Sequence, residues 1–378
     1  MSYTVDQELL PDIKVIGVGG GGGNAVNRMV HANIPGVTFV AVNTDAQALA
    51  SSDAELRLRI GEKLTKGLGV GGDPTRGERA AEESRAELEE LLDGAEMVFV
   101  AAGMGGGTGT GAAPVIAEVA REVGALTIGT VTTPFAWEGA ARSRAARGGI
   151  DQLREKVDTL ISIPNSRLLE SCPDDFTMDQ AFEMADDVLR QAIQAISNII
   201  SQNGAINLDF NDVRTVMSEA GPALLAIGDA SGENRAAEAA KKATASPLLD
   251  QTINGATNVL FNVTHDGNLK LRELDIAARV IAEVVDSTAN IIFGTVIDPS
   301  VGDSVHMTVI ATGFSDMQAP TVGLKRNAAS KPRAVALELP GISSEEDAEL
   351  PAFLRRNIRS MGEISANGDR EARMAERR

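Results

Sequence analysis

The stretch Gly103-Met-Gly-Gly-Gly-Thr-Gly-Thr-Gly111 is the segment that decides the fold. An apolar run over residues 97–102 precedes it and predicts a buried strand, and a helical pattern over residues 112–123 follows it. Six glycines and two threonines among nine residues exceed the needs of a simple turn. Glycines here open a nest of backbone N–H donors, and the threonine hydroxyls add further donors. The stretch therefore predicts a phosphate-binding loop between a strand and a helix.

A second glycine run, Gly17-Val-Gly-Gly-Gly-Gly-Gly23, also lies between a predicted strand and a predicted helix. Gly17, Gly19 and Gly22 satisfy G-x-G-x-x-G, and Asp45 follows at the distance that a dinucleotide-binding fold requires. On its own this run fits a nicotinamide-dependent enzyme as well as a nucleotide-triphosphate site. Two such loops in one sheet favour a longer phosphate chain, and no G-x-x-x-x-G-K-[ST] is present, which excludes a P-loop.

Short aliphatic runs alternate with helical patterns over the first half of the chain. This alternation predicts an α/β fold with a Rossmann-like, mostly parallel nucleotide-binding sheet, followed by a long central helix and a second α/β domain. Predicted strands lie at residues 13–18, 37–42, 97–102, 126–131, 159–163, 223–227, 258–263, 289–297 and 304–311. Predicted helices lie at residues 24–32, 74–93, 112–123, 178–201, 211–217, 234–244 and 274–285. Asp73 is expected to cap the helix that Pro74 opens.

The composition narrows the class of protein and its partners. The chain has 378 residues and is 43% hydrophobic, enough for two domains with a substantial core. Its net charge of −18 argues against nucleic-acid binding. No apolar run approaches the ~20 residues of a membrane span and no signal-peptide pattern opens the chain, so we expect a cytoplasmic protein without direct membrane insertion. The single cysteine, Cys172, excludes an intramolecular disulfide, and the three histidines lack metal-ligand spacing.

Beyond Phe314 the helical and strand periodicity stops. Residues 317–348 are rich in Ala, Pro, Ser and charge, which predicts a flexible linker within a disordered C-terminal tail. One apolar and basic island, Leu350-Pro-Ala-Phe-Leu-Arg-Arg356, is either a peptide that folds on a partner or an incidental cluster. The last residues are basic through Arg370, Arg373, Arg377 and Arg378.

The loop Gly105–Gly111, with the sequence G-G-G-T-G-T-G, resembles the signature of the tubulin/FtsZ GTPases. Further segments resemble bacterial FtsZ in the same order, namely Lys14–Asn24, Ala41–Asp45, Thr133–Phe135, Glu138–Arg142, Asn207–Asp212 and Leu350–Arg356. The resemblance implies a GTP-binding domain over 13–176, a central helix over 177–203 and a C-terminal domain over 204–316. An N-terminal tail over 1–12, the linker over 317–348, a partner-binding peptide over 349–358 and a basic variable tail over 359–378 complete the expected organisation.

The resemblance also implies which residues bind GTP or GDP. The phosphates would lie against the two glycine loops and the residues that line them, namely Gly19, Gly20, Gly21, Asn43, Asp45, Gly71, Gly72, Gly103, Gly105, Gly106, Gly107, Thr108, Gly109, Thr132 and Pro134. Glu138 and Arg142 would hold the ribose and nearby phosphate, assisted by Asn165. Asn24 and Asp187 would read the guanine edge, with Asp186 an alternative for the latter, and Phe182 would stack on the base. Without the resemblance, Phe182 is a core residue and the Glu138–Arg142 spacing an exposed helical ion pair.

In the same family Asp209, Asp212 and Asn207 would act on the γ-phosphate held by the neighbouring subunit. Mg²⁺ would bind the nucleotide phosphates, with Asp209 or Asp212 of the next subunit as a further ligand. Hydrolysis in trans would make GTP turnover depend on head-to-tail polymerisation at the mid-cell division ring, and Leu350–Arg356 would bind membrane tethers and division regulators. Without the resemblance, the two aspartates are an ordinary loop residue and a helix N-terminal carboxylate.

Two alternatives remain open from the sequence. A nicotinamide-dependent enzyme would use the first glycine run but leaves the second loop and residues 207–212 unexplained. A family member that assembles without hydrolysing GTP would be a scaffold, although the presence of Asp209 and Asp212 argues against it.

Overall fold

The computed structural model describes residues 11–169, 172, 175–201, 209–246 and 253–314. The linker, the Leu350–Arg356 peptide, the basic end of the chain and Asn207 all lie outside the described residues. None of the described helices combines the length and the apolar character that a bilayer crossing requires.

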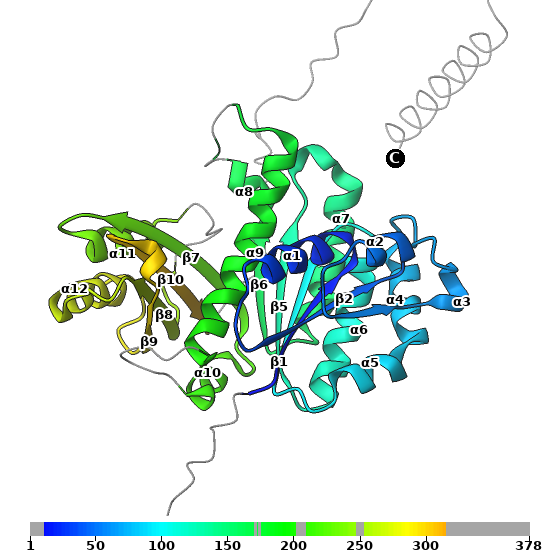
Figure 1. Ribbon diagram of the computed structural model, residues 1–378, viewed down its shortest axis with the longest axis horizontal. Coiled ribbons are helices and arrows are strands. Elements are labelled where there is room, and N and C mark those ends of the chain that lie inside the picture. Colours follow the sequence, from blue (N-terminus) through cyan, green and yellow to red (C-terminus); the bar gives the residue numbers. More distant parts are fainter. Residues whose placement is uncertain (1–10, 170–171, 173–174, 202–208, 247–252, 315–378) are drawn as a thin grey trace, which may run out of the picture. The chain divides into compact units, whose positions relative to one another are not determined.

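The described elements are numbered along the chain (Figure 1). The first part contains β1 (Ile13–Val18), α1 (Gly19–His31), β2 (Val37–Asn43), α2 (Ala46–Ala50), β3 (Leu56–Arg59), α3 (Glu62–Thr65), α4 (Pro74–Glu83), α5 (Arg85–Leu92), β4 (Met97–Gly103), α6 (Thr108–Glu122), β5 (Leu126–Thr133), η1 (Ala136–Glu138), α7 (Ala140–Arg154), β6 (Thr159–Pro164) and α8 (Asn165–Leu169). The second part contains α9 (Met178–Ser201), α10 (Phe210–Met217), β7 (Gly221–Ser231), α11 (Arg235–Thr244), β8 (Asn258–His265), α12 (Leu271–Ala282), β9 (Asn290–Ile297), η2 (Pro299–Val301) and β10 (Ser304–Thr312).

The strands of the described residues form one ten-stranded sheet in the order β3-β2-β1-β4-β5-β6-β7-β10-β8-β9. β10 is antiparallel to both of its neighbours, and every other pair is parallel, which confirms the expected α/β class. The second domain continues this sheet rather than forming a separate layer, because Gly221–Ala223 of β7 pairs with Thr159–Ile161 of β6.

Alternating side chains divide the core between the two faces of the sheet. Ile13 and Val15 of β1 face a cluster that contains residues of α1, α9 and α10, whereas Ile16 and Val18 face residues of α4, α5, α6 and α7. The first cluster also contains apolar residues of β7, β8 and β10, so the buried face of α9 packs on both parts of the sheet. A third cluster joins α11 and α12 to the other face of β7–β10.

Most predicted elements are present, with three kinds of difference. α1 and α6 begin inside the glycine runs, at Gly19 and Thr108, rather than at residues 24 and 112. The helix expected over 74–93 is divided into α4 and α5 at Ser84, whose Oγ accepts a hydrogen bond of 3.2 Å from the Gly61 N–H. The short edge strand β3 and the helices α2, α3, α7 and α8 lie outside the predicted ranges. The capping prediction is confirmed, because Asp73 Oδ1 accepts from the Thr75 N–H at 3.0 Å.

Glycines let α4 and α6 approach each other closely. A Cβ atom on Gly111 of α6 would lie 1.9 Å from the carbonyl oxygen of Pro74, and one on Gly77 of α4 would lie 2.4 Å from that of Gly107. Backbone therefore packs against backbone at this crossing, and the close packing positions the loop that precedes α6.

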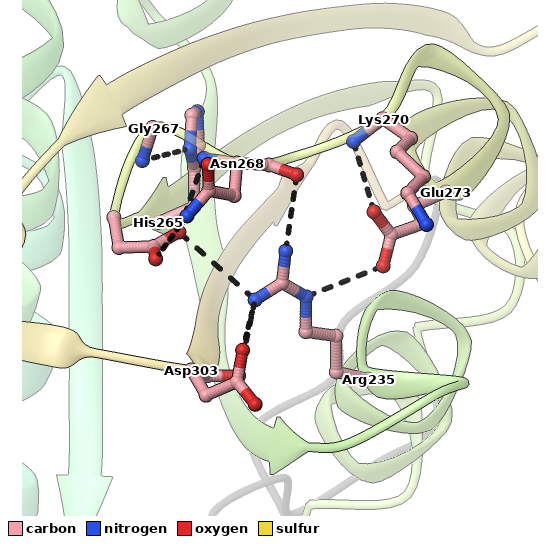
Figure 2. A network of polar contacts seen from close by, with 8 residues as sticks. Arg235, His265, Gly267, Asn268, Lys270, Glu273 and Asp303 are labelled. Carbon is pink, nitrogen blue, oxygen red and sulfur yellow. Dashed lines mark hydrogen bonds and ion pairs between the residues drawn. The ribbon is translucent and has the colours of Figure 1, made fainter.

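Arg235 ties together three segments of the second domain, as Figure 2 shows. Its guanidinium is buried, with 7% of the side chain exposed. Nε lies 3.2 Å from Glu273 Oε1, Nη1 donates to the Asp303 carbonyl at 3.1 Å, and Nη2 donates to the Asn268 carbonyl at 3.3 Å. These contacts join the start of α11 to α12 and to the segment before β10.

We expect Arg235→Ala to lower the free energy of unfolding by about 2 kcal/mol, because the Glu273 carboxylate and two carbonyl groups lose their charged donor. Arg279→Ala is the matched control, since it removes an arginine whose 3.1 Å pair with Asp275 is exposed. The control is expected to change the same quantity by less than about 0.5 kcal/mol. Chemical denaturation of both variants measures the difference, and equal losses would contradict the prediction.

Candidate functional site

The two glycine loops meet at the carboxyl ends of the parallel strands. A Cβ atom on Gly19 would lie 2.8 Å from the backbone nitrogen of Gly109, and one on Gly21 would lie 3.3 Å from the Cα atom of Gly103. The first turns of α1 and α6 thus lie backbone against backbone, and Gly19 has a φ of +73° that favours glycine. Gly20 lies in the first turn of α1 with open space around it.

The electrostatics of these two helix N-termini favour an anion. Neither α1 nor α6 has an acidic residue in its first turn, although the whole chain has a net charge of −18. Unpaired backbone N–H groups and the helix dipoles give both ends positive potential. The arrangement can therefore bind a chain of phosphate groups through backbone donors.

The residues that surround these turns come from neighbouring strand ends. The Met104 N–H donates to the Thr132 carbonyl at 2.8 Å, and a Cβ on Gly105 would lie 3.3 Å from Pro134 Cγ. Gly105 also donates its N–H to Thr110 Oγ1 at 2.8 Å, which fixes the turn through Gly106.

Two further segments border the phosphate loops. A Cβ on Gly107 would lie 3.1 Å from the Gly72 carbonyl carbon, so the segment that contains Gly71 packs against the second loop. Asn43, the last residue of β2, accepts from the Asp45 N–H at 3.2 Å, and Asp45 in turn caps α2. Asn43, Gly19, Gly20 and Asn24 also line a hollow between β2 and α1.

Thr108 opens α6 beside a buried hydroxyl from another element. Its Oγ1 lies 2.8 Å from Oγ1 of Thr44, which follows β2 directly and is fully buried. The sequence does not indicate this contact.

Glu138 and Arg142 form the expected ion pair at the end of β5. Arg142 Nη1 bonds Glu138 Oε2, while Glu138 Oε1 accepts from the Phe135 N–H at 2.8 Å. The Glu138 side chain is 7% exposed and that of Arg142 is 59% exposed. The Arg142 guanidinium therefore faces solvent, and the buried Glu138 carboxylate holds it in place. Asn165 begins α8 after the neighbouring strand, and its buried Oδ1 has no hydrogen-bond partner among the described residues. Such an oxygen can accept from a ligand hydroxyl or amide.

Phe182 belongs to an aromatic cluster rather than to the main core. Its ring meets Phe135 edge to face with centroids 5.4 Å apart, and Trp137 likewise at 6.0 Å. Trp137 stacks on the buried Phe135 at 5.5 Å. Phe182 is 37% exposed, which leaves part of its ring available to a planar ligand.

Asp186 and Asp187 point to different partners. Asp186 Oδ2 accepts from Arg28 Nε of α1 at 3.3 Å, and its side chain is 14% exposed. Burial raises the pKa of Asp186 to about 6; Arg28 opposes this shift and Glu183 adds to it. Asp187 instead bonds two residues of its own helix, Arg190 Nε at 2.6 Å and Gln191 Nε2 at 2.5 Å.

Asp209 and Asp212 lie away from the glycine loops of the same chain. Both are exposed at the start of α10, where Asp209 Oδ1 caps the helix by accepting from the Asp212 N–H at 2.8 Å. α10 packs at the amino ends of the strands, because Arg214 donates to the Gly124 carbonyl ahead of β5 and Thr159 Oγ1, at the start of β6, donates to the Met217 carbonyl. Figure 1 shows α10 at the end of the sheet where β1 begins. These carboxylates therefore lie at the amino ends of the strands, whereas the glycine loops lie at the carboxyl ends.

Both the part of the chain with the glycine loops and the part that follows α10 match known protein families. The family model described as the tubulin/FtsZ family GTPase domain matches residues 12–173, and that of the FtsZ family C-terminal domain matches residues 221–315. An FtsZ dimer structure from M. jannaschii is 41% identical with a TM-score of 0.79, and the match covers 82% of this chain and 90% of that chain.

Two more distant structures share the fold. The GDP-bound CetZ1 monomer of Haloferax volcanii is 21% identical, with a TM-score of 0.71 over 81% of this chain and 95% of that chain. A GTPγS-bound CetZ2 protofilament from the same organism is 23% identical, with a TM-score of 0.67 over 79% and 92%. The family matches decide against the nicotinamide-dependent alternative. The chain belongs to the tubulin/FtsZ family and is a GTPase that binds guanine nucleotides.

Proposed function

We propose that the chain polymerises head-to-tail into protofilaments of the bacterial division ring and hydrolyses GTP at the junction between two subunits. The observation that supports this most is that the glycine loops lie at the carboxyl ends of the strands, whereas Asp209 and Asp212 lie at the amino ends. The phosphate site and the exposed carboxylates of Asp209 and Asp212 lie at opposite ends of the strands in one chain, and they become one complete site when two chains stack in the same direction. Such heterologous contacts do not close and therefore form filaments.

The phosphates of GTP would lie between the first turns of α1 and α6, held by the N–H groups of Gly19–Gly21 and Gly106–Gly109. Thr132, Pro134, Asn43, Asp45 and the Gly71–Gly72 segment border this place. The Glu138–Arg142 pair and Asn165 lie at the adjacent strand ends, where we place the ribose. The exposed part of Phe182 would stack on the guanine.

For the guanine edge we favour Asp186 over Asp187. Asp186 is four residues after Phe182, so both lie on one face of α9, and it bonds Arg28, which is four residues after Asn24 on one face of α1. The two faces that carry Asn24, Phe182 and Asp186 therefore meet. Asp187 lies one position further round α9 and bonds Arg190 and Gln191.

This assignment predicts a pH dependence of GTP affinity. Guanine N1–H and its amino group require an ionised acceptor, and the pKa of Asp186 is about 6, so the free chain protonates this group as the pH falls below 6. Between pH 7.5 and pH 5.0 we expect the Kd for GTP to rise about tenfold more in the wild type than in Asp186→Asn, which binds weakly throughout. Fluorescence anisotropy below the assembly concentration measures both, and the titration of GTP itself is common to the two proteins. A weakened Asp187→Asn beside an unaffected Asp186→Asn would reverse the assignment.

At the junction, Asp209 and Asp212 would orient the attacking water on the γ-phosphate bound by the neighbouring chain, and Asn207 would accompany them. Phosphoryl transfer depends mainly on positioning and electrostatics, which exposed carboxylates on a rigid helix start can provide. Asp209 already caps α10 through Oδ1, so its Oδ2 and both oxygens of Asp212 are the acceptors for this role.

Mg²⁺ fits this site only together with the nucleotide. No cluster of three His, Cys, Asp or Glu side chains exists among the described residues. Mg²⁺ commonly binds substrate phosphates and one or two carboxylates rather than an all-protein cage. Asp209 or Asp212 of the next subunit would supply such a carboxylate, and the ion would neutralise phosphate charge when bound.

The remaining parts of the proposal concern location and partners. We place the protein in the cytoplasm at mid-cell, where Leu350–Arg356 would bind membrane tethers and division regulators. The acidic chain has no expected nucleic-acid partner.

The rate of GTP hydrolysis against protein concentration tests the shared site. We expect turnover per chain to be low in dilute protein and to rise above a threshold concentration, together with light scattering. The reason is that only assembled chains have complete sites. A rate per chain that stays constant across the threshold would overturn hydrolysis in trans, and absence of GTP binding would overturn the nucleotide assignment itself.

A further inference from the structure

We infer that Thr44 is a positioning residue for Thr108: its hydroxyl donates a hydrogen bond to Thr108 Oγ1 and leaves the Thr108 proton directed at a nucleotide phosphate. The inference rests on the proposed function, because it takes the phosphates to lie at the first turn of α6. It adds a group that does not itself contact the nucleotide.

The contact joins two elements that meet at the strand ends. Thr44 directly follows β2 and has no exposed surface, whereas Thr108 is the first residue of α6. Their Oγ1 atoms are 2.8 Å apart, which is the usual length of an O–H···O hydrogen bond. Thr65 Oγ1 lies 3.3 Å from the Thr44 carbonyl oxygen and 3.0 Å from that of Gly61, so these two carbonyls share its one proton. Thr44 is therefore held from both its backbone and its side chain.

The direction of the bond follows from the number of protons. Each threonine hydroxyl has one proton to donate and two lone pairs. Phosphate oxygens at neutral pH mainly accept, so Thr108 can bind a phosphate favourably only by donating its own proton to it. If Thr108 donated to Thr44 instead, its lone pairs would face the phosphate charge. The proton between the two hydroxyls must then come from Thr44, and the order of donation is Thr44 to Thr108 to phosphate.

A purely structural contact would have a different consequence. If the two hydroxyls only joined β2 to α6, their loss would lower the stability of the nucleotide-free protein and leave its affinity for GTP unchanged. If Thr44 positions Thr108, its loss should mainly lower the affinity for GTP. Without Thr44 the Thr108 hydroxyl rotates freely and loses its fixed direction. The two hydroxyls should also act as one unit, so that their effects on affinity do not add.

The experiment measures the Kd for GTP below the assembly concentration for Thr44→Val, Thr44→Ser, Thr108→Val and the Thr44/Thr108 double valine variant. We expect Thr44→Val and Thr108→Val each to raise the Kd about tenfold, equivalent to about 1.4 kcal/mol. Thr44→Ser, which keeps the hydroxyl, should stay within about twofold of the wild type, and the double variant should be no more than about twofold weaker than Thr108→Val. Melting temperatures without nucleotide verify that each variant folds.

Thr127→Val is the matched control, since Thr127 is a fully buried threonine of β5 whose hydroxyl donates to the Ala125 carbonyl. It should lower the melting temperature without changing the Kd. Additive effects of the two valine substitutions, or a Thr44→Val protein with wild-type affinity, would overturn the inference. Neither result bears on hydrolysis in trans, because binding is measured on single chains. A wild-type protein that does not bind GTP would instead overturn the proposed function, on which the inference rests.

Discussion

Asp212→Ala is expected to lower GTP turnover at least about 100-fold while the affinity for GTP stays within about twofold of the wild type. The carboxylate lies on α10 at the amino ends of the strands, so its removal leaves the glycine loops of the same chain intact. Asp229→Ala is the control, because it removes an exposed carboxylate from β7 of the same domain and is expected to keep full activity.

Mixing two inactive variants distinguishes catalysis in trans from catalysis within one chain. Gly20→Asp introduces a carboxylate into the phosphate loop, where space is open and the helix dipole tolerates it, so the chain should fold but repel the phosphates. In an equal mixture with Asp212→Ala, one junction in four pairs an intact nucleotide site with an intact Asp212. We therefore expect about a quarter of the wild-type rate. A mixture as inactive as its components would contradict the shared site.

Gly111→Ala is expected to cause the largest loss of stability, at least about 3 kcal/mol. The added methyl group would lie 1.9 Å from the Pro74 carbonyl oxygen and 2.6 Å from the Glu78 nitrogen. Both are backbone atoms of α4, so no side chain can move aside and the two helices must separate. Chemical denaturation measures the loss.

Gly148→Ala is the comparison for this substitution. Gly148 lies in α7, and no atom of another element lies within 4 Å of the added Cβ. Alanine there is expected to stabilise the protein by about 0.5–1 kcal/mol, because it restricts the unfolded chain and suits a helix. A Gly111→Ala protein as stable as Gly148→Ala would show that α4 and α6 tolerate a wider separation.

Apart from the exposed edge strand β3, the strands of the first domain were predictable because buried parallel strands are continuous apolar runs, as in Met97–Gly103. The helix starts were not, because glycine runs normally indicate loops. Here the glycines of the first turn of α1 are required by close packing. A side chain on Gly19 would collide with the Gly109 nitrogen, and one on Gly22 would collide with the Ala101 carbonyl oxygen. The continuity of the sheet was also missed. It depends on three residue pairs between β6 and β7, which are far apart in sequence and have no local signal.

The candidate site was predictable where it consists of local motifs, but not where it depends on contacts between residues far apart in sequence. The glycine loops are local motifs, and the structure brings them together. The contacts of Asp186 with Arg28 and of Thr44 with Thr108 join residues 158 and 64 positions apart. Only the i, i+4 spacings of Asn24 with Arg28 and of Phe182 with Asp186 indicate the first contact, and no sequence signal indicates the second.

The placement of α10 opposite the glycine loops has an arithmetical consequence under the proposed mechanism. A row of n chains has n nucleotide sites but only n − 1 junctions, so the chain at one end always retains a nucleotide that no neighbour can hydrolyse. Turnover per chain then increases with row length as (n − 1)/n. The two ends of a row also differ permanently, one ending in a bound nucleotide and the other in uncovered carboxylates.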